Sequence, residues 1–286
     1  VLGRVFQKHV LLRVHEAADR SEVGLEPVLN ELQRREFIRP RDHDAGAGRG
    51  LDAEFIFKHA LTHDVAYNSL LLARRKAIHL TVGEAMESIF PDRLDELAAS
   101  LARHFANAER RDKAIHYLNR AGERAQATFA NAEAIGFYRD ALDQIELAQA
   151  EGGAALPEAQ PGSASRLHER VGDLLELTGR HDEARTAYEE ALARTPASDS
   201  VAAARRHRKW GSSHLIQRRY EETLRGYLEA ERRLGADANV DAVAWWTERV
   251  DIYLERMWLD YWRGRVQDMI DLGGQCRRGR RQQAEN

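Results

Sequence analysis

One window of the chain constrains its fold more than any other. Residues 165–196 (SRLHERVGDLLELTGRHDEARTAYEEALARTP) divide at Gly179 into two amphipathic stretches, and the second stretch ends at Pro196. Glycine is favoured just past the end of a helix, and proline cannot continue one. Apolar residues recur three and four positions apart in both stretches, which is typical of helices with one buried face. The window therefore predicts a helical hairpin.

Small residues stand where the two predicted helices have to cross. Gly172 has no Cβ, so a neighbouring helix can approach it closely. Ala184 and Ala191 are small on the second helix, and Tyr188 between them is large enough to fill the groove.

The same pattern recurs on both sides of this window. The downstream copy, 39 residues later, has Gly211, Tyr227 and Ala230. The upstream copy, 50 residues earlier, has Gly122, Ala134, Tyr138 and Ala141. This pattern resembles the tetratricopeptide repeat, a helix–turn–helix unit of 34 residues that stacks into an α–α superhelix.

The chain before these repeats has a different pattern. Two helical stretches, at 5–17 and 25–35, precede two short apolar runs, Phe37-Ile38 and 55–57, around a polar, glycine-rich segment. Apolar runs that flank such a turn predict a β-hairpin. Helices closed by a hairpin indicate a small winged-helix-like module.

We therefore expect an all-α fold, with tetratricopeptide-like hairpins preceded by this module. From residue 94 onward, helical periodicity is clear at 94–105, 113–125, 130–147, 241–262 and 265–274. The expected domains are a winged-helix-like module (1–72), first hairpins (73–148), a loop or linker (149–164), further repeats (165–274) and a polar basic tail (275–286).

A second resemblance covers most of the chain. The segment 55–79 (FIFKHALTHDVAYNSLLLARRKAIH) is similar to the stretch that follows the nucleotide-binding domain of STAND-type, AAA-related ATPases, often found C-terminal to bacterial class III adenylate/guanylate cyclase domains. Residues 101–125, 132–142 and 245–272 resemble the superhelical turns of that family. The Lys-His-Ala-Leu-Thr motif stands at 58–62, but His63-Asp64 replaces the usual Gln-Glu.

The resemblance implies that the catalytic parts of such a protein lie upstream of Val1. The chain has no G-x-x-x-x-G-K-[ST] motif, and its one glycine-rich tract, 46–50, has no lysine to reach a phosphate. We expect no catalytic residue, no cofactor site and no metal site in this chain. A nucleotide-binding enzyme fragment is the less favoured alternative.

Histidine and cysteine give little support to a metal site. His59 and His63 lie four residues apart, so they share a helix face, but the sequence supplies no third or fourth ligand. A surface or packing role is the preferred interpretation. The single cysteine, Cys276, excludes an internal disulfide, and no apolar stretch is long enough to span a membrane, so we expect a cytoplasmic protein.

Two basic clusters, 205–209 and 277–281, suggest either a solvated face and a basic tail or a site for an acidic partner. The candidate partner-docking residues are Arg205, Arg206, Arg208 and Lys209. DNA binding is disfavoured, because Glu26, Glu31 and Glu36 lie in or beside the helix that would meet phosphate.

Aromatic residues concentrate near the C-terminus, where Trp245, Trp246, Trp258, Tyr261 and Trp262 lie on one predicted helix. They predict either core packing between repeats or an aromatic groove that anchors a peptide or another domain.

These observations predict a non-catalytic, protein-binding regulatory arm of a larger signalling ATPase–cyclase. Its partner would be a separate protein or the upstream domains of its own parent. The alternative is the regulatory region of a repeat-containing ATPase-type transcription regulator or kinase with a DNA-binding output.

Overall fold

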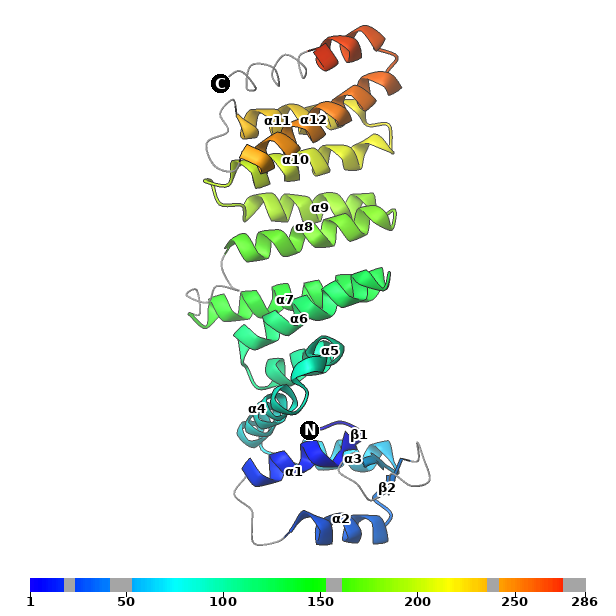
Figure 1. Cartoon of the computed structure of the whole chain (residues 1–286), viewed down its shortest axis with the longest axis vertical. Helices are drawn as coiled ribbons and strands as arrows, with labels where there is room; N and C mark the ends of the chain where they lie inside the picture. The colour runs from blue at the N-terminus through cyan, green and yellow to red at the C-terminus, as the bar shows by residue number, and fades with distance from the viewer. Residues whose placement is uncertain (18–23, 42–52, 153–160, 236–241, 275–286) are drawn as a thin grey trace. The chain divides into compact units, whose positions relative to one another are not determined.

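The computed structural model describes residues 1–17, 24–41, 53–152, 161–235 and 242–274. These residues form two compact units, Val1–Arg124 and Ala125–Asn286, which we describe separately. Figure 1 shows the helices and strands of the chain with their labels.

The first unit combines helices with a small antiparallel sheet. Its elements are β1 (Val5–Gln7), α1 (Lys8–Ala17), α2 (Leu25–Arg34), β2 (Ile38–Pro40), β3 (Glu54–Phe57), α3 (Ala60–Asn68), α4 (Leu72–Ile89), η1 (Pro91–Arg93), α5 (Leu94–Asn107) and the first part of α6 (Arg111–Ala127). The three strands lie in the order β1-β3-β2.

The predicted β-hairpin is confirmed, because β2 and β3 pair with Ile38 opposite Phe57. Residues 42–52, which include the glycine-rich tract 46–50 where the turn was predicted, lie outside the described residues. The helix predicted over 5–17 is wrong at its start, where residues 5–7 form β1. Phe6 pairs with Phe55 across the sheet and stacks on its ring at 5.8 Å. Local periodicity cannot reveal a contact between residues so far apart in sequence. Here the pairing with β3 gives residues 5–7 an extended conformation instead of a helical one.

The second unit consists of helical hairpins (Figure 1). Its helices are the end of α6, α7 (Asn131–Ala150), α8 (Pro161–Leu177), α9 (His181–Ala193), α10 (Ser200–Leu215), α11 (Tyr220–Leu234) and α12 (Ala242–Trp262), followed by helix over 266–274. The predicted all-α class is confirmed. Half of the linker expected at 149–164, residues 153–160, lies outside the described residues, whereas α7 extends to Ala150 and α8 begins at Pro161.

The hairpins are held together by glycines that face large or closely packed neighbours. A Cβ built on Gly172 would lie 2.5 Å from Cε1 of Tyr188, so no other residue fits without movement. In the next hairpin the neighbouring atom belongs to the backbone, because a Cβ on Gly226 would lie 2.5 Å from Cα of Gly211. The helices α8–α9 and α10–α11 therefore approach each other to distances that a side chain would prevent.

Candidate functional site

The small residues singled out in the sequence lie inside the hairpins. Gly179 ends α8 with a φ of +77°, which glycine adopts without strain, and Pro196 follows the end of α9. Gly122, Gly172 and Gly211 are buried. The buried alanines and tyrosines are Ala134, Tyr138, Ala141, Ala184, Tyr188, Ala191, Tyr227 and Ala230. Sequence analysis missed Gly226, which faces Gly211, and Gly83, which faces the ring of Phe105.

The basic cluster on α10 lies against carboxylates of α8. Glu169 accepts hydrogen bonds from Arg205 Nε at 2.7 Å and from Lys209 Nζ at 2.8 Å, and its other oxygen lies 3.0 Å from Arg206 Nε. Lys209 also donates to Asp173 at 2.7 Å. The Arg206 side chain is only 2 % exposed. One buried carboxylate thus connects three cations.

The remaining cation of the cluster faces α12. Arg208 donates to Glu248 Oε1 at 2.6 Å and to Asp251 Oδ2 at 3.4 Å, and it also pairs with Glu255. Its side chain is 12 % exposed. We call the carboxylates and cations that join α8, α10 and α12 the charge ladder. It is made of Glu169, Asp173, Arg205, Arg206, Arg208, Lys209, Glu248, Asp251 and Glu255.

Every cation of the charge ladder is paired with a carboxylate of the same chain. Burial raises the pKa of Glu169, but the charges of Lys209 and Arg205 more than offset this effect and hold the pKa at about 2. The expectation of a solvated face is therefore wrong for Arg206 and Arg208. An acidic partner at residues 205–209 has to compete with carboxylates that already bind the same cations.

The aromatic residues of α12 divide into a buried and an exposed group. Trp245 is 4 % exposed and donates its indole N–H to the carbonyl of Leu234 at 3.1 Å, so it belongs to the core. Trp258, Tyr261 and Trp262 are 58 %, 55 % and 60 % exposed. We call these three the aromatic patch.

The aromatic patch is continuous and borders a hollow. Tyr261 contacts the rings of Trp258 and Trp262, with centroids 5.8 and 5.7 Å away. Trp262 also lines a hollow of about 470 Å³ beside the turn between α10 and α11. Its other lining residues are Leu215, Ile216, Arg218 and Tyr220. The aromatic residues of α12 were expected either to pack in the core or to line a groove. Core packing does not describe Trp258, Tyr261 and Trp262.

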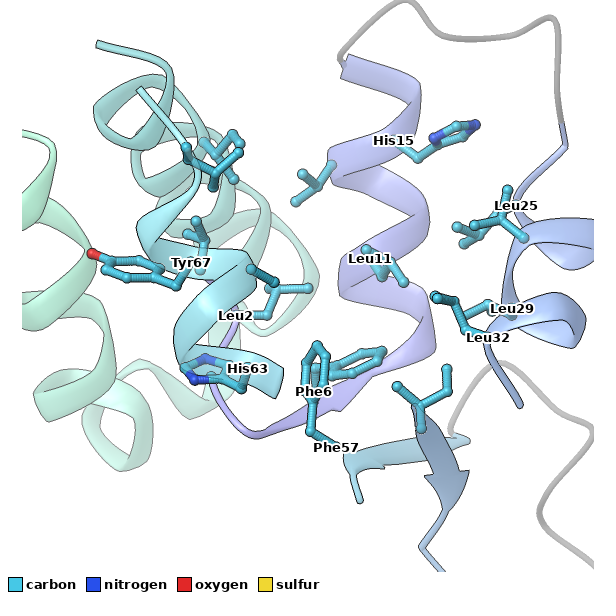
Figure 2. A pocket seen from close by; sticks show the side chains of 18 of the residues that line it. Leu2, Phe6, Leu11, His15, Leu25, Leu29, Leu32, Phe57, His63 and Tyr67 are labelled. Carbon is cyan, nitrogen blue, oxygen red and sulfur yellow. The ribbon is translucent and has the colours of Figure 1, made fainter. Parts of the chain in front are cut away.

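The first unit contains an apolar pocket of about 390 Å³, which the sequence did not predict (Figure 2). It lies among α1, α2, α3, α4 and the sheet, and Figure 2 shows the leucines of α1 and α2 turned toward one another. The lining residues labelled there are Leu2, Phe6, Leu11, His15, Leu25, Leu29, Leu32, Phe57, His63 and Tyr67. Leucine-rich periodicity predicts a buried face but not the space that remains after packing.

A line of polar rings leads from this pocket into the interior of the first unit. Tyr67, which lines the pocket, lies with its hydroxyl 3.1 Å from Nε2 of His79, and Nδ1 of His79 lies 3.0 Å from Nδ1 of His104. Burial lowers the pKa of both histidines, assisted by the charge of Arg103, to about 4 for His79 and about 3 for His104. Both imidazoles are therefore neutral at pH 7, so that one ring N–H can donate to the other ring.

The histidine pair considered as a zinc site is placed differently. His59 precedes α3 and is exposed, whereas His63 binds Asp64 at 2.9 Å. Across the described ranges, no group of three His, Cys, Asp or Glu side chains is arranged to hold a metal ion. Nor does any helix in those ranges combine the length and apolar character needed to cross a membrane.

Comparisons with known proteins support the fold only. No protein-family model matches the chain, and no curated protein matches its sequence. Among solved structures it is similar to the one described as "Crystal structure of BtubC (BKLC) from P. vanneervenii", with a TM-score of 0.50 and 12% identity over 78% of this chain and 87% of that chain. The structure described as "Crystal structure of MamA" aligns with a TM-score of 0.31 and 17% identity over 56% of this chain and 91% of that chain, a score too low to support an argument. The likeness to the first structure agrees with an all-helical fold.

Proposed function

We propose that this chain is a non-catalytic protein-interaction arm with a regulatory role in a larger signalling protein. The observation that carries the proposal is the aromatic patch of Trp258, Tyr261 and Trp262, each more than half exposed. Large aromatic side chains dominate the binding energy of protein interfaces because each buries a large apolar area with little loss of conformational freedom. An exposed group of three next to a hollow is characteristic of a docking site.

The helical hairpins supply a rigid support for this patch. Close packing at Gly172 and Gly211 and the charge ladder hold α8 to α12 in fixed positions relative to one another. A partner that binds α12 therefore meets a surface that is already organised, which lowers the entropic cost of binding.

We further propose that the larger protein is a signalling ATPase–cyclase. The resemblance of residues 55–79 to the junction of STAND-type ATPases supports an arm that regulates upstream nucleotide-binding and cyclase domains. The module proposed for residues 1–72 has the element order β1-α1-α2-β2-β3-α3, which is compatible with a winged helix. Its α2 gives no support to DNA binding, because Glu31 binds both Arg34 and Arg35.

Site-specific crosslinking tests the docking site. A photoreactive phenylalanine analogue placed at Trp262 should form a discrete adduct in cells that produce the full-length parent. The same analogue at Phe129, which is 86 % exposed in the turn before α7, is the matched control and should form none. Equal labelling at both positions, or none at either, contradicts the proposal.

Calorimetry separates the interaction arm from the enzyme alternative. The isolated chain titrated with ATP and Mg²⁺ should release no heat of binding. Binding at micromolar affinity would instead favour a nucleotide-binding fragment.

A further inference from the structure

The apolar pocket of the first unit has the dimensions and composition of a small-molecule site. Its volume of about 390 Å³ lies in the range of ligand pockets, which are mostly apolar with a few placed polar groups. Phe6 and Leu29 form part of its wall, and both are buried in the core of the unit. The wall is therefore fixed by packing that does not depend on a ligand.

The ionisable side chains that line the pocket are basic or neutral. Among the described lining residues, they are His15, His63, Arg74 and Tyr67, and no carboxylate is present. Figure 2 shows His15 and His63 apart from each other, with Leu2 and Leu11 between them in this view. His63 pairs with Asp64, which lies outside the lining and is 62 % exposed. The site therefore complements a molecule with an apolar body and an anionic end.

One wall of the pocket is weakly held. Helix α3 has no buried residue, although Ala66 and Tyr67 line the pocket from it. On its outer face Leu61 and Val65 are 74 % and 62 % exposed. A helix with so few buried contacts opens at low free-energy cost, so α3 provides a route by which a ligand can enter.

We propose that the apolar pocket binds an anionic amphiphile of the fatty-acid class. The alkyl chain lies among the leucines of α1 and α2, and the carboxylate accepts hydrogen bonds from the exposed Arg74 at the margin. Burial of the alkyl chain supplies most of the affinity, and the charge selects among amphiphiles. This site is separate from the aromatic patch and does not depend on the proposed docking function.

Titration with three probes of equal chain length tests the class of ligand. Isothermal calorimetry of the whole chain below the critical micelle concentration should show one molecule of dodecanoate bound. Dodecanol should bind roughly tenfold more weakly, since a charged hydrogen bond contributes over 1 kcal/mol, and dodecyltrimethylammonium should bind more weakly still. Equal binding of the cation and the anion would overturn the assignment, as would no binding of dodecanoate.

Two variants of α3 locate the site. Ala66→Trp should abolish dodecanoate binding, because the indole occupies the pocket from a helix that is not itself buried. Ala60→Trp adds the same ring to the exposed start of α3, outside the lining, and should bind like the unmodified chain. Unchanged binding in Ala66→Trp would overturn the proposal.

Two further measurements test the charge and the entry route. Arg74→Gln should weaken dodecanoate about tenfold and leave dodecanol unchanged. Hydrogen exchange should show that dodecanoate slows exchange of the α3 amides. If Arg74→Gln weakened the binding of dodecanoate and dodecanol equally, the assigned orientation of the ligand would be wrong. If dodecanoate did not slow exchange in α3, the role of α3 as the entry route would be wrong.

Discussion

The two compact units are held together by different kinds of side-chain contact. In the first unit, Phe6, Leu25, Leu29 and Phe55 form an apolar core beside the apolar pocket. In the second, glycines bring helices into close contact and the charge ladder joins α8, α10 and α12. Where helices and a sheet meet at irregular angles, leucine side chains do not fill all the space between them. The stacked hairpins of the second unit leave no such space at their glycine contacts. The comparison indicates that the apolar pocket belongs to the first unit and that the closest helix packing belongs to the second.

The largest effect is expected at the centre of the charge ladder. Glu169→Ala leaves the buried Arg206 without its carboxylate and should lower the free energy of unfolding by about 4 kcal/mol. The folded pKa of about 2 lies below the ordinary value of 4.5, so this stabilisation is present above pH 4.5 and is lost as the pH falls toward 2. Urea unfolding at pH 7 and at pH 3 measures both effects.

A control for this variant exists on the next helix. Glu183 is half exposed and pairs with Arg180, so Glu183→Ala should change stability little. If the two variants behave alike, the charge ladder is not what makes the second unit rigid.

A slightly smaller effect is expected at the tightest helix contact. Gly226→Ala places a Cβ 2.5 Å from the backbone of Gly211 and should cost about 3 kcal/mol. Gly136→Ala on α7, where nothing lies within 4 Å, should instead stabilise by about 0.5 kcal/mol. The sign of the difference, read from denaturation midpoints, tests the close-packing argument directly.

The buried histidine pair should make the first unit sensitive to mild acid. His79 and His104 have folded pKa values of about 4 and 3, below the ordinary 6.5. The unfolded state therefore binds protons first, and stability falls as the pH drops from 6.5 toward these values. We expect a loss of about 2 kcal/mol by pH 4.5.

Hydrogen exchange of the α4 and α5 amides measures this loss within the first unit. His104→Gln should flatten the pH dependence because the amide carries no charge. An NMR titration of the unmodified protein in which both imidazoles protonate near pH 6.5 would contradict the buried pair.

The smallest effect on stability is expected at the aromatic patch. Trp262→Ala should change the free energy of unfolding by only about 0.5 kcal/mol, because the side chain is 60 % exposed. Trp245→Ala, which removes a buried ring, is the positive control for destabilisation. A large loss in Trp262→Ala would mean that the patch belongs to the core and is not a docking surface.

Much of the fold could be predicted because its signals are local. Glycine and proline at Gly179 and Pro196, with apolar spacing of three and four, identify α8 and α9. The strand β1 could not be predicted, because its partner Phe55 lies about fifty residues away. For the candidate site, the aromatic residues were recognised, but their division into buried Trp245 and exposed Trp262 depends on which neighbours cover each face of α12.

The sequence by itself determined the helices, the hairpin repeats and the absence of a phosphate-binding loop motif, since each follows from residue types at short spacing. Only the tertiary structure decided that the cations of 205–209 face carboxylates of α8 and α12, and that the leucines of the first unit enclose a pocket. Charge compensation and empty volume depend on distances between helices. Such distances follow from the packing of all side chains together and are encoded in no single segment.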